Sequence, residues 1–203
     1  AIEHEHPNPY IRHAGSMTDS GSFFYPNQMG RIILLSMEEV MGRNGVHAVL
    51  KLASLQSLLD NYPADSMERA FPFSQVSNLT ETLEQLYGPH GGRGLAVRIG
   101  RACFNYGVRQ YGAQLGITEM AFRLLPLPAK ISAGARAFAE LFNRFTDQKV
   151  RVEEDGDRLL WHIERCPLCW ERHAQEPVCH LAVGLLQEAL YWLSGGKVFT
   201  VEE

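Results

Sequence analysis

Three of the four cysteines of the chain lie in one short segment, and their spacing is suited to metal binding. Cys166 and Cys169 form a Cys-x-x-Cys pair, and Cys179 follows it, directly before His180. A Cys-x-x-Cys turn brings two sulfurs to one point, and zinc in proteins takes four ligands, most often thiolates and imidazoles. The segment therefore predicts a structural zinc site with Cys166, Cys169 and Cys179 among its ligands.

The fourth ligand has three candidates: His173, His180 and a carboxylate at the end of the chain. The spacing after Gly196 predicts a last strand over residues 197–203. The period of two places Glu203 on the apolar face of this strand and turns Glu202 to water. A carboxylate on an apolar face is costly unless it is paired or binds a metal, so Glu203 is the favoured acid.

Two interpretations without metal stay open for these cysteines. They are a reactive thiol pair, or buried structural thiols. The remaining cysteine, Cys103, lies in a long apolar stretch, and we expect it to be a packed thiol.

Apolar side chains on both sides of the cysteine segment predict a hydrophobic pocket. The stretch 178–193 has two apolar faces at helical spacing, and aromatic residues occur in the flanking segments. Such walls bind a hydrophobic small molecule with little need for polar groups, but the same residues can simply fill a core. The predicted pocket residues are Tyr106, Trp161, Leu181, Leu185, Trp192 and Phe199.

Composition excludes several classes of function. The chain has 203 residues, of which 45% are hydrophobic and 21% charged, with a net charge of −4 and no run of lysine and arginine. These values indicate a globular protein that does not itself bind nucleic acid. No apolar stretch approaches the roughly 18–20 residues that span a bilayer, and no secretory signal is recognisable. Together with the Cys-x-x-Cys pair, this predicts a cytoplasmic protein.

Motifs for catalysis are not found. The glycine-rich stretch 88–94 follows no predicted strand and lacks the dinucleotide spacing, so no nucleotide cofactor is expected. There is no Gly-x-Ser-x-Gly nucleophile motif. The sequence therefore favours a binding protein over an enzyme.

Periodicity predicts mostly helices first and mostly strands last, which indicates an α+β fold with an N-terminal helical layer packed on a small C-terminal antiparallel sheet. Residues 1–25 are read as an arm and 26–203 as a single domain. A hairpin of alternating apolar residues is expected over 150–163, with its turn at 154–157. The predicted helices span 27–41 (closed by Gly42), 46–59, Ser74 or Ser77 to Gly88, 91–115, 133–145 and 178–193. Proline punctuates a break at 124–128, and Gly100, Gly107 and Gly112 are expected to allow close approach of another element or of a ligand.

Four stretches together resemble the 4-vinyl-reductase (hydrocarbon-binding) domain family, over about residues 26–203. They are Tyr-Gly-x-x-Gly-Gly-x-Gly-Leu-x-x-Arg-Ile-Gly-Arg at 87–101, Phe-Arg-Leu-Leu-Pro at 122–126, the segment around Cys166 and Cys169 at 161–169, and the stretch from Pro-Val-Cys-His to Ser-Gly-Gly at 177–196. The resemblance implies a bacterial ligand-binding domain of the NO-signalling and Golgi-transport type, related in fold to subunits of the TRAPP tethering complex. It also implies a homodimer with an apolar pocket.

The resemblance implies a zinc ligand set as well. The family uses a cysteine matching Cys179, a strand glutamate matching Glu203 and two cysteines that follow that glutamate. Because this chain ends at Glu203, either its C-terminal end is truncated or Cys166 and Cys169 take those places.

Three functions follow from these patterns. The first is binding or sensing of an aromatic, hydrocarbon or lipid-like molecule, as in the phenol-responsive transcription activators that the sequence resembles. The second is an enzyme or accessory protein of (bacterio)chlorophyll 4-vinyl reduction, which would need a hydride or electron donor site that no motif provides. The third is a homodimeric interaction module, with the helix 27–41 and the long glycine-bearing helix as contact faces.

Overall fold

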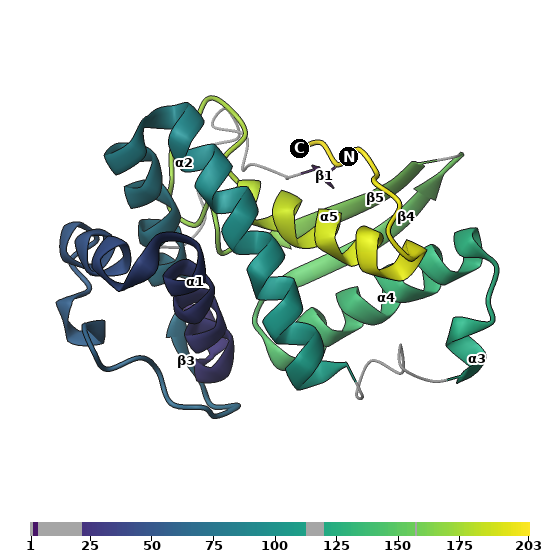
Figure 1. The fold of residues 1–203 in the computed structure, drawn as a ribbon, viewed down its shortest axis with the longest axis horizontal. Helices are drawn as coiled ribbons and strands as arrows, with labels where there is room; N and C mark the ends of the chain where they lie inside the picture. The colour runs from purple at the N-terminus through teal and green to yellow at the C-terminus, as the bar shows by residue number, and fades with distance from the viewer. Residues whose placement is uncertain (1, 4–21, 113–119, 157) are drawn as a thin grey trace, which may run out of the picture.

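The computed structural model describes residues 2–3, 22–112, 120–156 and 158–203, and these form an α+β fold (Figure 1). Long helices precede a hairpin and a last helix, as the sequence predicts. The elements in chain order are β1 (Ile2–Glu3), β2 (Phe24–Pro26), α1 (Asn27–Leu52), the 3-10 turn η1 (Gln56–Leu58), β3 (Arg69–Pro72), α2 (Phe73–Tyr111), α3 (Met120–Arg123), α4 (Leu127–Phe145), β4 (Lys149–Asp155), β5 (Arg158–Arg165) and α5 (His180–Ser194).

Helices α1 and α2 are each kinked at a glycine where the sequence predicts a helix end. Gly42 has φ 73° and ψ 162°, and Gly88 has φ 72° and ψ 167°. Only glycine adopts this backbone region readily, so the helix breaks there. Both helices resume directly after the glycine, and at the second kink Pro89 provides a residue suited to the first helical turn.

Several predicted helix boundaries were wrong. The second part of α1 ends at Leu52 and not at residue 59. Helix α2 begins at Phe73, so Ser74 and Ser77 lie inside it and neither caps it. Helix α4 begins at Leu127, because Pro128 occupies its first turn and does not break it. The predicted residues 113–115 of the long helix lie outside the described residues.

Helix α2 lies between α1 and α5, and it approaches α5 very closely (Figure 1). A Cβ atom on Gly100 of α2 would lie 2.0 Å from the carbonyl oxygen of Leu181, and one on Gly184 of α5 would lie 2.0 Å from that of Val97. The two helix backbones are therefore in contact at a pair of glycines. The prediction that Gly100 allows close approach of another element is confirmed.

The predicted hairpin is confirmed, and β4 continues through Glu154 and Asp155, which were predicted to lie in the turn. β4 and β5 are antiparallel, with Val150 opposite Ile163 and Val152 opposite Trp161. β1 pairs with β5 in parallel on its other edge, which gives the sheet order β1-β5-β4. A second sheet, of β2 and β3, was not predicted, because each strand ends in a proline that is typical of loops.

The predicted last strand is wrong. Residues 197–203 are all described and form no strand. The segment instead runs beside α5 and lines a cavity with it. The expected alternation survives without main-chain pairing: Phe199, Val201 and Glu203 are half-buried, whereas Val198 and Glu202 are exposed.

Of the predicted arm 1–25, residues 1 and 4–21 lie outside the described residues. The described remainder contributes β1 and most of β2. Within the described part of the chain, the helices do not combine the length and apolar character that crossing a bilayer requires.

Candidate functional site

The three clustered cysteines converge as the sequence predicts. The Sγ atoms of Cys166, Cys169 and Cys179 all lie within 4.8 Å of one another, and those of Cys166 and Cys179 are 3.4 Å apart. Cys166 follows β5 directly, Cys169 begins the turn closed by the hydrogen bond from Arg172 N–H to its carbonyl, and Cys179 is the residue before the first turn of α5. Cys166 and Cys179 are buried and Cys169 is half-buried. We refer to these three residues as the sulfur cluster.

The geometry of the sulfur cluster fits three of the four ligands of a zinc ion. Two sulfurs bound at about 2.3 Å to a tetrahedral zinc lie about 3.8 Å apart, close to the separations observed. Burial is the main cause that raises the pKa of Cys166, and hydrogen bonding with Cys166 and Cys169 is the main cause that raises the pKa of Cys179. The thiols of Cys166 and Cys179 are thus protonated without metal, and a divalent cation would replace their protons.

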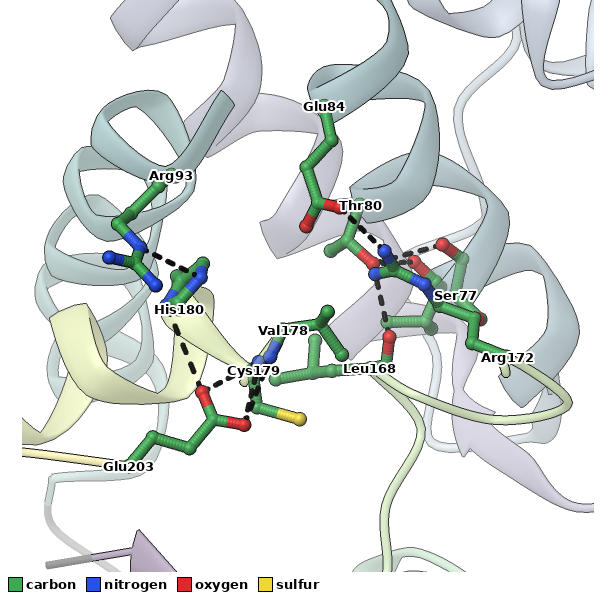
Figure 2. Close-up of polar contacts among 11 residues, drawn as sticks. Ser77, Thr80, Glu84, Arg93, Leu168, Arg172, Val178, Cys179, His180 and Glu203 are labelled. Atoms are coloured by element: carbon green, nitrogen blue, oxygen red, sulfur yellow. Dashed lines mark hydrogen bonds and ion pairs between the residues drawn. The ribbon is translucent and has the colours of Figure 1, made fainter. Parts of the chain in front are cut away.

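Glu203 lies at the start of α5 and not in the sulfur cluster (Figure 2). Its Oε1 accepts hydrogen bonds from the main-chain N–H groups of Val178 (3.1 Å) and Cys179 (3.0 Å), and its Oε2 accepts one from Cys179 at 2.8 Å. A carboxylate is favoured there, because the first N–H groups of a helix have no partner inside the helix and carry partial positive charge. The sequence correctly indicates an inward-facing acid that needs a partner, and the partner is the helix start.

The two candidate histidines also lie outside the sulfur cluster among the described residues. His180 accepts a hydrogen bond at Nε2 from Arg93 Nε (3.0 Å), and its Nδ1 is 3.8 Å from Glu203 Oε2. Burial, followed by the charge of Arg93, lowers the pKa of His180, so the imidazole is neutral and its proton is on Nδ1. His173 lines a separate polar pocket with Arg93 and Arg172.

The loop that carries the sulfur cluster is fastened to α2 by contacts that sequence reasoning missed (Figure 2). The Thr80 hydroxyl donates to the carbonyl of Leu168 (3.2 Å), and Arg172 forms an ion pair with Glu84 (2.7 Å). Thr80 and Glu84 are four residues apart and so lie on one face of α2. This spacing of two polar residues is the signal in the sequence for a polar contact face. These contacts fix the loop against α2 from outside the sulfur cluster.

A first cavity, here called the central cavity, lies directly beside the sulfur cluster. Its volume is about 90 Å³, and residues of α1, α2, α4, α5 and β5 line it. The predicted pocket residues Trp161, Leu181 and Leu185 line it, as does Cys103. Cys103 is a packed thiol as predicted, and burial raises its pKa to about 12.

A few polar side chains line the otherwise apolar central cavity. The Tyr25 hydroxyl donates a hydrogen bond to Gln148 Oε1, and the Tyr111 hydroxyl donates one to Gln28 Oε1. Tyr25, Gln148 and Tyr111 line the cavity. Sequence reasoning missed all three, because Tyr25 falls in the predicted arm and the others carry no motif.

A second cavity, here called the lateral cavity, lies between α4, α5, β5 and residues 199–201. Its volume is about 290 Å³, and Phe199 and Trp161 are among its lining residues. The two cavities share Phe138, Trp161 and Leu186 as lining residues.

Two predicted pocket residues line neither cavity, and this corrects the prediction. Trp192 is 39% exposed near the end of α5, where its ring lies 6.4 Å from that of Phe104. Tyr106 is half-buried in α2, and burial followed by a hydrogen bond with Glu39 raises its pKa. Helical spacing put both on an apolar face, but that face is covered only in part.

Comparison of the chain with models of protein families and with curated proteins finds no match.

Proposed function

We propose that the chain binds a small aromatic or hydrocarbon molecule in the central cavity, and that a zinc ion on Cys166, Cys169 and Cys179 holds part of the cavity wall in place. One observation carries the proposal. Pro167 and Leu168, which lie between the first two cysteines, and Leu181 and Ala182, which follow the third, all line the central cavity. A zinc ion on the cysteines and a ligand in the central cavity would therefore contact the same short segments of the chain.

The size of the central cavity restricts the ligand. A cavity of about 150 Å³ in another protein binds benzene, and the central cavity is smaller, at about 90 Å³. A single ring would fit if the side chains that form the wall shared with the lateral cavity moved. Burial of the apolar surface of the ring would then contribute about 25 cal/mol per Å² to the binding free energy. The Gln148 amide and the Tyr25 hydroxyl provide a polar contact for one hydroxyl group, as on a phenol.

A matched pair of glycine variants tests the location of the ligand. Gly107 lines the central cavity, whereas Gly94 lies on the exposed side of the same helix. A Cβ atom at either position would meet no described atom within 4 Å, so both positions have room for the start of a side chain. Phenol and toluene should raise the melting temperature of the wild type and of Gly94→Leu by a few degrees, and that of Gly107→Leu much less. Equal shifts in both variants would place the ligand elsewhere.

Metal analysis tests the zinc site separately. We expect one zinc ion per chain after reconstitution, and loss of most of it in Cys166→Ser, Cys169→Ser and Cys179→Ser. Cys103→Ala is the control, because Cys103 is buried outside the sulfur cluster. Undiminished zinc in all three serine variants would contradict a metal on these sulfurs. Phenol binding should weaken in the metal-free protein, because Pro167 and Leu168 are then less firmly held.

A further inference from the structure

We propose that the lateral cavity is a second ligand site, and that it takes amphiphilic carboxylates with an alkyl or arylalkyl body of medium length. This site does not depend on the proposed function, because it contains neither the sulfur cluster nor the polar side chains of the central cavity.

The walls of the lateral cavity fit an apolar body. Ile131 and Ala135 of α4 face Leu190 and Leu193 of α5 across it, and Phe199 lines it from the C-terminal segment. Its volume of about 290 Å³ is close to the lower end of the range for small-molecule sites, about 300 Å³. It is also nearly twice the roughly 150 Å³ that holds benzene in another protein. A ring with a side chain, or a folded alkyl chain, is the size of molecule that fills it.

A cation among the described lining residues indicates the charge of the head group. Arg158, the first residue of β5, lines the lateral cavity and is exposed to solvent. Within the described residues it has no ion pair, although two neighbouring arginines do: Arg136 pairs with Glu154 (2.8 Å) and Arg151 with Glu153 (2.5 Å). An unpaired guanidinium beside an apolar cavity is complementary to a carboxylate, which it can bind through two parallel hydrogen bonds.

The two cavities therefore select ligands by charge. The polar side chains that line the central cavity include two phenols, one amide and one thiol, and no charged residue lines it in the described part of the chain. Among its described lining residues, the lateral cavity has one cation, Arg158, and one hydroxyl, that of Thr200. A neutral ring is expected in the first and an anionic amphiphile in the second.

Titration calorimetry with octanoate and with 1-octanol tests the role of charge. The two probes have the same chain and differ in the head group. Arg158→Gln should weaken octanoate binding about three- to fivefold, as expected for an exposed ion pair, and leave 1-octanol binding unchanged. Arg151→Gln is the matched control on the same hairpin and should change neither. Raising the salt concentration should weaken octanoate binding to the wild type alone. Equal octanoate affinities for wild type and Arg158→Gln would overturn the proposal.

A second pair of variants tests the location. Ala135→Phe fills the lateral cavity and should abolish octanoate binding. Gly107→Leu fills the central cavity and should abolish toluene binding while octanoate still binds. Loss of octanoate binding in Gly107→Leu but not in Ala135→Phe would place the carboxylate in the central cavity and refute the second site. If the wild type binds octanoate but not toluene, the proposed function fails and the second site stands. Failure of the proposed function and failure of the second site are therefore distinguishable. If Ala135→Phe does not fold, the Arg158→Gln and salt comparisons still decide the question.

Discussion

At the scale of single residues, the buried thiol of Cys103 makes the stability of the protein sensitive to alkaline pH. Burial raises its pKa to about 12 in the folded state, whereas an unfolded cysteine titrates near 8.5. The unfolded chain therefore loses this proton first as pH rises. The stability that the neutral thiol contributes is complete below about pH 8.5 and is lost progressively above it.

The unfolding free energy should accordingly fall from about pH 8.5 up to about pH 12, as measured by urea unfolding in the presence of a chelator and a reductant. Cys103→Ala should show a shallower fall over the same range, because it removes one of the groups responsible. Tyr111, whose pKa burial raises to about 12, adds to the loss at the upper end. An equally steep fall in Cys103→Ala would show that the thiol does not contribute.

Glu203 and Glu202 are adjacent residues with opposite expected effects. The side chain of Glu203 is 7% exposed and its carboxylate accepts main-chain hydrogen bonds at the start of α5, whereas Glu202 is exposed. Glu203→Gln should lower the unfolding free energy by about 1–2 kcal/mol, and Glu202→Gln should leave it within about 0.5 kcal/mol.

The measurement is best made by urea unfolding of the metal-free protein. The cap described here acts without metal, so the loss should persist in chelator. A destabilisation by Glu203→Gln that appears only with zinc present would instead identify the carboxylate as a metal ligand.

At the scale of elements, the contact between α2 and α5 depends on the absence of two side chains. Alanine at Gly100 or Gly184 would place its Cβ 2.0 Å from a carbonyl oxygen, and backbone cannot move aside as a flexible side chain can. Each substitution should cost about 2–3 kcal/mol or more, because the helices must separate.

Alanine at Gly94 of the same helix is the control. It meets no described atom within 4 Å and should stabilise the helix by up to about 1 kcal/mol. Chemical denaturation of the three variants measures this contrast. A loss at Gly100 no larger than the effect at Gly94 would mean that the helices do not pack as closely as described.

Local signals explain which elements could be predicted from the sequence. The alternation around Val152 and Trp161 specifies the hairpin, and Gly42 and Gly88 break their helices through their own backbone conformations. The convergence of the three sulfurs is also local, because Cys166 and Cys169 share one turn.

Long-range partners explain what could not be predicted. β2 pairs with a strand more than forty residues away, and neither has enough residues to show a period. Residues 197–203 have the alternation of a strand but pair with no strand in the described part of the chain. For the same reason the sequence indicates that Glu203 faces inward and does not identify the N–H groups that it meets.

At the scale of the whole molecule, the shared wall of Phe138, Trp161 and Leu186 predicts that the two cavities are energetically coupled. The central cavity is smaller than a benzene-binding cavity, so a ring can enter only if the wall moves, and the lateral cavity is the space into which it can move. Toluene and octanoate should therefore oppose each other's binding.

Linkage requires the two effects to be reciprocal: saturating toluene weakens octanoate binding by the same factor by which octanoate weakens toluene binding. Calorimetric titration of each ligand in the presence of the other measures it, and Leu186→Ala, which gives the wall more room, should bring the factor closer to one. Independent binding in the wild type would mean that the wall is rigid, and a single ring would then have no space in the central cavity.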